Sequence, residues 1–110
     1  MPVGARLRIE YLDQNEAFAE SLPTSGVVRR MLKTSDSSAW YLLDLDDPVE
    51  YIGNTYERIV VRSRWAGHEL GETEPTSVFI ALIRDSSLLD KDPTPVDNLE
   101  LIAWGMSHTT

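Results

Sequence analysis

The chain has 110 residues, of which 25% are charged, and its formal net charge is −8. It contains no cysteine, which excludes disulfides, thiolate nucleophiles, cysteine-ligated zinc and iron–sulfur clusters. No apolar run reaches the roughly 18 residues of a membrane span, and residues 1–10 contain no apolar signal core. We therefore expect one cytoplasmic domain over residues 1–110. Its acidic balance favours basic partners and disfavours nucleic acid.

The first part of the chain predicts two strands separated by a long loop. Leu7, Ile9 and Tyr11 alternate with charged residues, which is the period-two pattern of a strand with one solvated face. Residues 13–22 are the one helical candidate, and because short helices are marginal in water we expect at most one short helical turn there. Residues 25–33 contain adjacent β-branched side chains and predict the second strand.

The rest of the chain predicts four more strands, at residues 39–46, 57–65, 77–83 and 99–104. The segment 39–46 is apolar enough to be covered on both faces, and 77–83 is apolar almost throughout, so we expect it to be central and buried. Residues 66–77 and 84–98 are polar and acidic, and both are predicted to be loops.

About six short strands in a chain of this length predict an all-β fold, either an antiparallel barrel or a small sandwich. Its expected core is Leu7, Ile9, Val28, Leu43, Ile59, Val61, Phe79, Ala81 and Leu101. The spacing of "GARLRIEYLD", "SGVVRRML" and "AWYLLDLDDP" resembles that of SH3-like small barrels, in which a long loop follows the first strand. The resemblance covers residues 4–84 and implies a fold but no activity. Because two long acidic loops exceed a minimal barrel, a split barrel or sandwich stays open.

An acidic and aromatic segment, "DLDDPVEYIGNTY" (44–56), is the first candidate site. Its spacing lacks the glycine and distal glutamate of a calcium loop. In the plainer interpretation the strand leaves the core here and Pro48 blocks further pairing. In the functional hypothesis the segment is a protruding loop whose acids attract a basic partner and whose tyrosines anchor it. The candidate partner-binding residues are Asp44, Asp46, Asp47, Glu50, Tyr51 and Tyr56.

Arginines on the predicted strands form the alternative site. A face that carries several arginines can bind a phosphate backbone or an acidic peptide. It can equally be a solvated face whose arginines pair with Glu10, Glu57 and the loop acids. The candidate anion-binding residues are Arg6, Arg8, Arg58, Arg62 and Arg64.

Aromatic side chains near the strand ends suit either a peptide groove or simple closure of the core. They are Trp40, Tyr41, Tyr51, Tyr56 and Trp65.

The sequence offers little for catalysis. Neither His68 nor His108 stands where a third group would hold it rigidly, and no glycine-rich phosphate loop is present. The carboxylates lie in polar loops, where ordinary pKa values make them poor general acids. We expect no enzymatic activity, no metal and no cofactor.

These patterns together predict a non-enzymatic protein–protein interaction module that binds a basic protein or peptide. By analogy in charge and size alone, small acidic cysteine-free domains of bacterial type include immunity and antitoxin-like inhibitors, and an adaptor role is an equal form of this hypothesis. The alternative is a nucleic-acid or phospho-ligand binder that uses the arginines, and the third hypothesis is a small-molecule or enzyme role for His68 and the acids. Homo-oligomer formation stays open.

Overall fold

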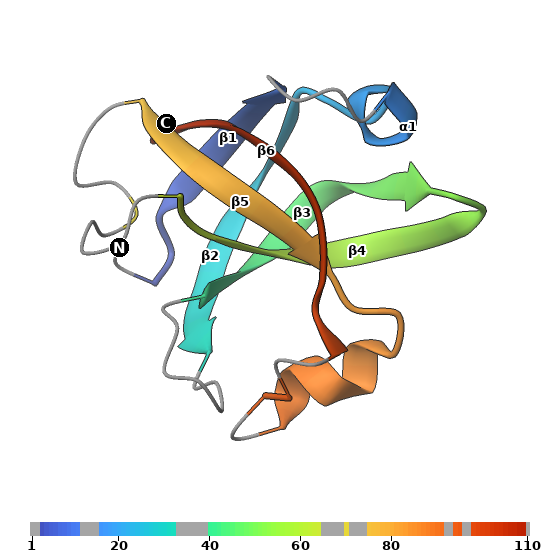
Figure 1. The fold of residues 1–110 in the computed structure, drawn as a ribbon. Coiled ribbons are helices and arrows are strands. Elements are labelled where there is room, and N and C mark those ends of the chain that lie inside the picture. The colour runs from blue at the N-terminus through green and yellow to red at the C-terminus, as the bar shows by residue number, and fades with distance from the viewer. Residues whose placement is uncertain are drawn as a thin grey trace.

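A computed structural model describes residues 3–11, 16–32, 40–64, 70, 75–91, 94–95 and 98–109. Their strands form a closed antiparallel barrel in which each strand pairs with its neighbours in sequence and β6 returns to β1 (Figure 1). The strands are β1 (Arg6–Tyr11), β2 (Thr24–Leu32), β3 (Trp40–Tyr51), β4 (Asn54–Ser63), β5 (Thr76–Leu82) and β6 (Glu100–Thr109). The expected all-β class and small antiparallel barrel are therefore confirmed, in the closed form.

Two short helical segments lie in the connections. The helical turn expected within residues 13–22 is α1 (Glu16–Ala19), between β1 and β2. A 3-10 helix, η1 (Ser86–Asp90), lies between β5 and β6, in a segment that the sequence predicted as loop throughout. In the ranges given above, no helix is long and apolar enough to cross a membrane.

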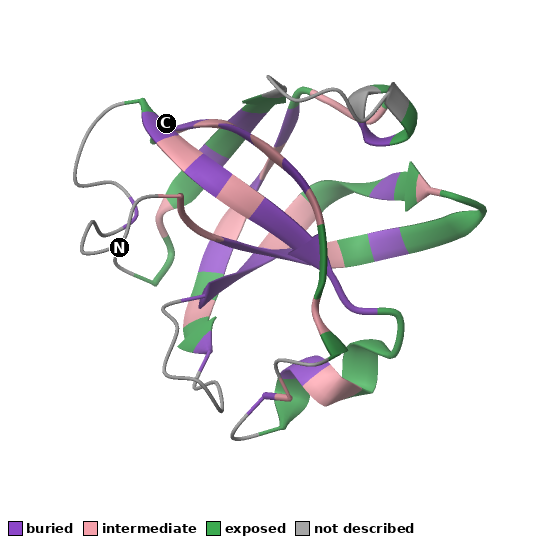
Figure 2. Cartoon of the chain, in the orientation of Figure 1, coloured by how far each residue is buried: buried purple, intermediate pink, exposed green. Residues whose placement is uncertain are grey.

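Buried residues occur along every strand (Figure 2). The apolar ones form two clusters, one on each face of the sheet. The inner cluster fills the barrel: Leu7, Ile9, Phe18, Val28, Tyr41, Leu43, Val49, Tyr56, Ile59, Val61, Leu70, Val78, Ile80, Leu82 and Ala103. The outer cluster lies on the other face, where the segment with η1 covers it: Leu32, Trp40, Leu42, Val60, Ala81, Ile83 and Leu89. The segment 39–46 was predicted to be covered on both faces. Trp40 to Leu43 are all buried as expected, whereas Asp44 and Leu45 are half-buried and Asp46 is exposed, and Ala39 lies outside the described residues.

The expected core was right on the first four strands and only partly right on the last two, where Ala81 is buried as predicted. Val78, Ile80 and Leu82 belong to the inner cluster, whereas Ala81 is in the outer cluster and Phe79 packs against it. A strand that is apolar on both faces gives no alternation from which to read its phase. Leu101 is also a wrong prediction, since it is 56% exposed. The register between β5 and β6 shifts at this point, because Ile80 aligns with Ala103 whereas Ala81 aligns with Leu101. The inward and outward alternation of side chains on β6 is therefore interrupted at Ile102.

β3 and β4 form a long hairpin that is interrupted by a bulge. The register jumps between Asp44 and Val49, so residues 45–48 bulge opposite Glu57. A bulge is one of the few places in a sheet that accept proline, and Pro48 lies in it. The interpretation that pairing ends at Pro48 is therefore wrong, because pairing resumes at Val49 and continues to the turn.

The hairpin closes with a two-residue turn, Ile52–Gly53, between the paired residues Tyr51 and Asn54. Both turn residues have positive φ, 47° and 78°, as a type I′ turn requires. Gly53 adopts this conformation without steric cost, but a β-branched residue such as Ile52 rarely does. Ile52 is nevertheless 68% exposed, so no packing of its side chain explains its place at the tip.

Candidate functional site

The acidic segment is a strand-turn-strand unit and not a loop, and its tip extends beyond the rest of the barrel (Figure 1). Two of its acids form ion pairs with arginines of β2 and β1. Asp44 Oδ2 lies 2.7 Å from Arg29 Nε, and Asp46 pairs with Arg6. All four side chains are partly or largely exposed, so these pairs contribute little stability and are screened by salt.

Three other acids of the hairpin have no such partner. Asp47, Glu50 and Glu57 are exposed. Across the described ranges, no arginine, lysine or histidine forms an ion pair with any of them. Glu57 was not among the predicted partner-binding residues, and its signal in the sequence was only an acid at the start of a predicted strand that is otherwise largely apolar and basic. The unpaired negative charge of the hairpin therefore lies on Asp47, Glu50 and Glu57.

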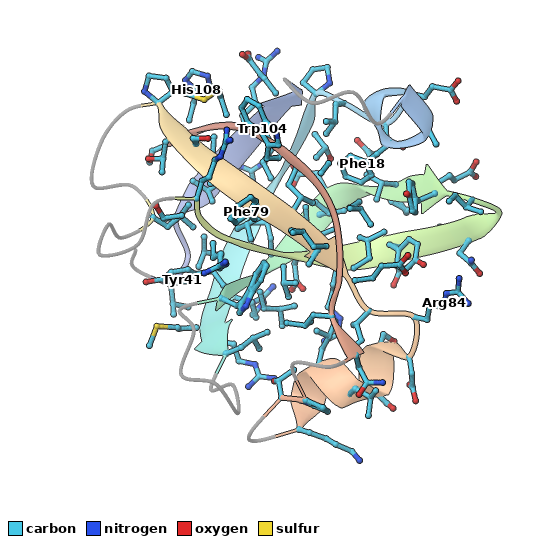
Figure 3. The ribbon with its side chains drawn as sticks, viewed as in Figure 1. Phe18, Tyr41, Phe79, Arg84, Trp104 and His108 are labelled. Atoms are coloured by element: carbon cyan, nitrogen blue, oxygen red, sulfur yellow. The ribbon has the colours of Figure 1, made fainter. Side chains whose placement is uncertain are left out.

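The two candidate tyrosines lie against the core. Tyr56 is 8% exposed and belongs to the inner cluster. The ring of Tyr51 is partly buried and meets Phe18 edge to face, with centroids 6.0 Å apart and planes at 72°. Phe18 is fully buried and reaches toward the hairpin from α1 (Figure 3). Near the acids, the exposed side chain of Ile52 at the tip is free to contact a partner.

The two edges of the hairpin differ. On the β3 edge, Ser21 Oγ donates a hydrogen bond to the carbonyl of Glu50 (3.1 Å) and accepts one from the N–H of Glu50 (3.3 Å). On the β4 edge, pairing with β5 begins only at Val60. Among the strand pairings of the described chain, none involves Asn54 to Ile59 on the side away from β3.

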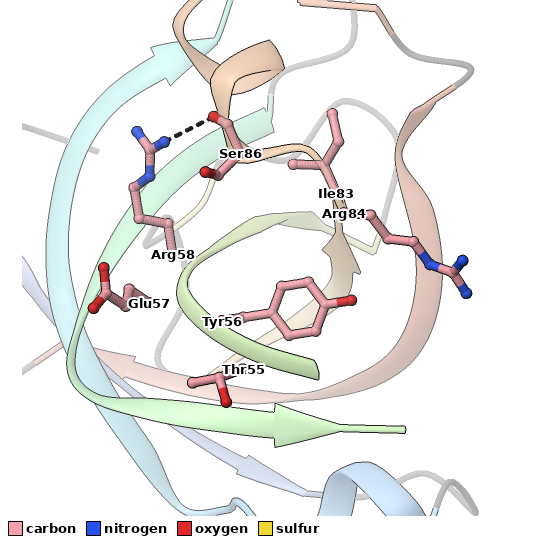
Figure 4. A pocket seen from close by; sticks show the side chains of 7 residues that line it. All are labelled: Thr55, Tyr56, Glu57, Arg58, Ile83, Arg84 and Ser86. Carbon is pink, nitrogen blue, oxygen red and sulfur yellow. Dashed lines mark hydrogen bonds between the residues drawn. The ribbon is translucent and has the colours of Figure 1, made fainter. Parts of the chain in front are cut away.

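Two hollows flank β4 beside this open edge. The larger, about 470 Å³, lies between Thr55–Arg58 and the segment that follows β5 (Figure 4). Its other wall is formed by Ile83, Arg84 and Ser86. The second, about 340 Å³, lies over the bulge, and Glu57 and Arg58 line both hollows.

The candidate arginines of β4 make contacts inside the molecule. Arg58 donates hydrogen bonds to the carbonyl of Ser86 (2.8 Å) and to Asp90 Oδ1 (3.1 Å), which ties β4 to η1. Arg62 places its guanidinium carbon 5.2 Å from the ring centroid of Trp40 and 5.1 Å from that of Phe79, within the range of cation–π attraction.

The remaining candidate arginines are similarly occupied and do not join into one stripe. Arg64 lies 4.1 Å from the ring of Trp104, and Arg8 lies 3.7 Å from Glu10. With Arg6 paired to Asp46, every one of the five has a partner within the chain. An anion would therefore compete with existing contacts at each of these arginines.

The histidines offer no catalytic arrangement in the described residues. His108 Nε2 lies 3.4 Å from Glu10 Oε2 on the barrel surface. His68 and Trp65 lie outside the described residues. In the part of the chain that is described, no group of three or more histidine, aspartate or glutamate side chains could hold a metal ion.

Comparison with known proteins gives no match for this chain among family models, curated proteins or solved structures.

Proposed function

We propose that this protein is a non-enzymatic interaction module that binds a basic protein or peptide at the β3–β4 hairpin. The observation that carries the proposal is the set of unpaired, exposed acids Asp47, Glu50 and Glu57 on a projecting hairpin. Long-range attraction by such a group raises the association rate with a cationic partner, and salt weakens it.

The contrast between acids and arginines supports a basic partner over an anionic one. The arginines of the alternative site already contact rings, carbonyls and carboxylates of the chain, as Arg62 and Arg58 do. The net charge of −8 adds repulsion against a phosphate backbone. Nucleic-acid or phospho-ligand binding has no comparable observation in its favour.

The proposal also includes the type of barrel, the type of interaction role and the cellular location. An SH3-like barrel is supported by the long connection after β1 and by the return of the last strand to β1. Small barrels of this kind present peptide-binding surfaces on strands and loops. An immunity, antitoxin-like or adaptor role is an analogy from size and charge only. A cytoplasmic setting is proposed from the absence of cysteine and of an apolar signal core in residues 1–10.

The test is binding to an array of lysine- and arginine-rich peptides, measured as association rate against salt concentration. The double variant Asp47→Asn, Glu50→Gln should bind the same peptides more slowly and with a flatter salt dependence, because it removes hairpin charge that has no other partner.

The matched control is Glu10→Gln, Glu100→Gln, which removes the same charge from β1 and β6. If both double variants slow binding equally, the attraction belongs to the whole molecule and the hairpin is not the site. If no basic peptide binds, the proposed function is wrong.

A further inference from the structure

We propose that the open edge of β4, at Thr55–Glu57, binds an extended basic peptide as an added β-strand. This inference rests on the proposed function, since it takes the partner to be basic, and it adds the mode of recognition. In strand addition, backbone hydrogen bonds supply affinity and the flanking side chains supply specificity.

The register of the hairpin identifies which backbone groups face the open edge. In a hairpin with a two-residue turn, the residues that flank the turn form a hydrogen-bonded pair, here Tyr51 and Asn54. The next pair, Glu50 and Thr55, is then non-hydrogen-bonded, so the N–H and C=O of both residues point away from the hairpin.

Ser21 provides an independent check on this register. Its hydroxyl bonds both the N–H and the C=O of Glu50 from outside the hairpin, as the assignment requires. The equivalent groups of Thr55 face the opposite side. Within the described residues no strand pairs with them. Glu57, two residues on, lies opposite the bulge of β3 and is exposed beside the same unpaired edge.

Space for a further strand exists beside these groups. β5 ends at Leu82, and Ile83 turns into the outer cluster, so the chain departs from the line that would continue along β4. The hollow of about 470 Å³ occupies that line, with Thr55–Arg58 on one wall (Figure 4). An added strand would extend the sheet where β5 leaves it.

Charge favours a basic peptide as the occupant. Glu57 lines the hollow, and Asp47 and Glu50 lie on the same hairpin. The two cations of the hollow do not oppose this. Arg58 is bound to Asp90 and Ser86, and the guanidinium of Arg84 extends away from Glu57 on the far wall (Figure 4).

A second copy of this chain is a poorer occupant for the same reason. Pairing two β4 edges about a two-fold axis would bring Glu57 of each copy close to the other, and like charges opposite each other destabilise a sheet. Charged side chains often protect the unpaired edges of natural sheets from association. On this edge, the negative charge of Glu57 would also favour a positively charged peptide.

The experiment uses an acetylated hexapeptide of alternating lysine and valine, its glutamate counterpart, and two versions of the lysine peptide that are N-methylated on alternate residues. We expect the lysine peptide to bind and the glutamate peptide not to bind. At least one methylated peptide should bind roughly tenfold more weakly, because methylation removes the donors that face β4. Bound lysine peptide should also slow hydrogen exchange of the Thr55 amide.

A protein variant makes the same test from the other side. Thr55→Pro removes an edge N–H that β3 does not use, and should weaken the lysine peptide by roughly tenfold. Thr55→Val keeps the N–H and should bind normally. If Thr55→Pro does not fold, judged by circular dichroism, the methylated peptides still decide.

Three results would overturn the inference. The first is unchanged affinity of both methylated peptides. If the double variant Asp47→Asn, Glu50→Gln still weakens binding in that case, the proposal that the hairpin acids bind a basic partner stands, and only strand addition at the β4 edge is wrong. The second is that the lysine peptide does not bind. Binding of other peptides in the basic array would then show that the proposed function holds although the strand-addition inference is wrong. The third is a dimer in sedimentation whose Thr55 amide is protected from exchange without peptide, which would assign the edge to a second copy.

Discussion

The inner and outer clusters are built from the same strands but are closed by different means. The inner cluster is enclosed by the whole barrel, with Phe18 of α1 at the mouth near the hairpin. The outer cluster is covered by one connecting segment through Leu89. Arginines hold that cover in place, since Arg30 donates to the carbonyl of Leu89 and Arg58 donates to that of Ser86.

This difference shows what the arginines of the strands do. On the outer face, Arg62 lies between the rings of Trp40 and Phe79, so its long side chain and planar head cover apolar surface. The sequence showed only the charge, which suggested a surface for anions. Val60, buried between Arg58 and Arg62, was the one sign that this face is partly covered.

The strongest test of the comparison is a pair of adjacent leucines on β3. Leu43 is buried in the inner cluster and Leu42 in the outer cluster. Leu43→Ala should cost about 4 kcal/mol of unfolding free energy, because the barrel cannot collapse around the cavity. Leu42→Ala should cost about 2 to 3 kcal/mol, since a single segment can move inward. Equal losses in chemical denaturation would show that the outer cluster is as rigid as the inner one.

A second prediction separates the cover from the barrel. Leu89 is the buried residue of η1, so Leu89→Ala should cost about 2 kcal/mol and should release η1 before the strands open. Hydrogen exchange of the η1 amides would measure this. Leu88→Ala, at a half-buried neighbour, is the control and should cost less. Uniform loss of protection over the whole barrel would contradict a separate cover.

A third prediction concerns the stacked arginine. Arg62→Lys should lose about 1 kcal/mol, because an ammonium group cannot stack between two rings as a guanidinium does. Arg62→Met should lower the free energy of unfolding by no more than Arg62→Lys does. In the described residues the buried Nε of Arg62 has no hydrogen-bond partner, so the methionine variant loses no hydrogen bond there. Chemical denaturation distinguishes the two. A large loss of stability for Arg62→Met with none for Arg62→Lys would mean that this position requires a positive charge and not a side chain that covers the rings.

Ile52 lies outside both clusters, so a substitution there tests backbone strain without any change in core packing. Ile52 has a φ of 47° at the exposed tip, so Ile52→Asn should stabilise the protein by about 0.5 to 1 kcal/mol by relieving backbone strain. Thermal denaturation measures the gain. A loss of stability would indicate that the Ile52 side chain packs against the fold after all.

The smallest effect expected is a pH dependence of the outer cover. Asp85 caps η1, and hydrogen bonds from the Ser87 hydroxyl and backbone N–H lower the pKa of its carboxyl below the ordinary 3.8. Since the pKa is lower in the folded state, the cap contributes fully above the unfolded value, and the contribution is lost as pH falls below about 3.8 and through the folded pKa. Exchange in η1 should rise there in the wild type, whereas Asp85→Asn should show no such step. The same rise in both would exclude the cap as its cause.

Short apolar runs and alternation together predicted all six strands and an all-β fold, with a barrel as one of two possible forms. Alternation also identified six members of the inner cluster: Leu7, Ile9, Val28, Leu43, Ile59 and Val61. It failed where a bulge or a strand apolar on both faces removed the period, as at Pro48 and Phe79. The hairpin turn was missed for a related reason, because Ile52–Gly53 lacks the Asn-Gly or Asp-Gly pair that favours a type I′ turn. The open edge of β4 could not be predicted either, since it depends on where β5 leaves the sheet.

The pairing of β6 with both β5 and β1 has a consequence for the order in which the chain folds. Leu7 aligns with Thr109, so the barrel closes through contacts between residues at opposite ends of the described chain. Contacts of such high sequence separation form slowly, because the intervening chain must be ordered first. A nascent chain that has not yet produced Glu100–Thr109 leaves both β1 and β5 without one neighbour, and two free edges invite association with other chains. Synthesis of the last strand therefore marks the end of a period in which this protein is open to aggregation.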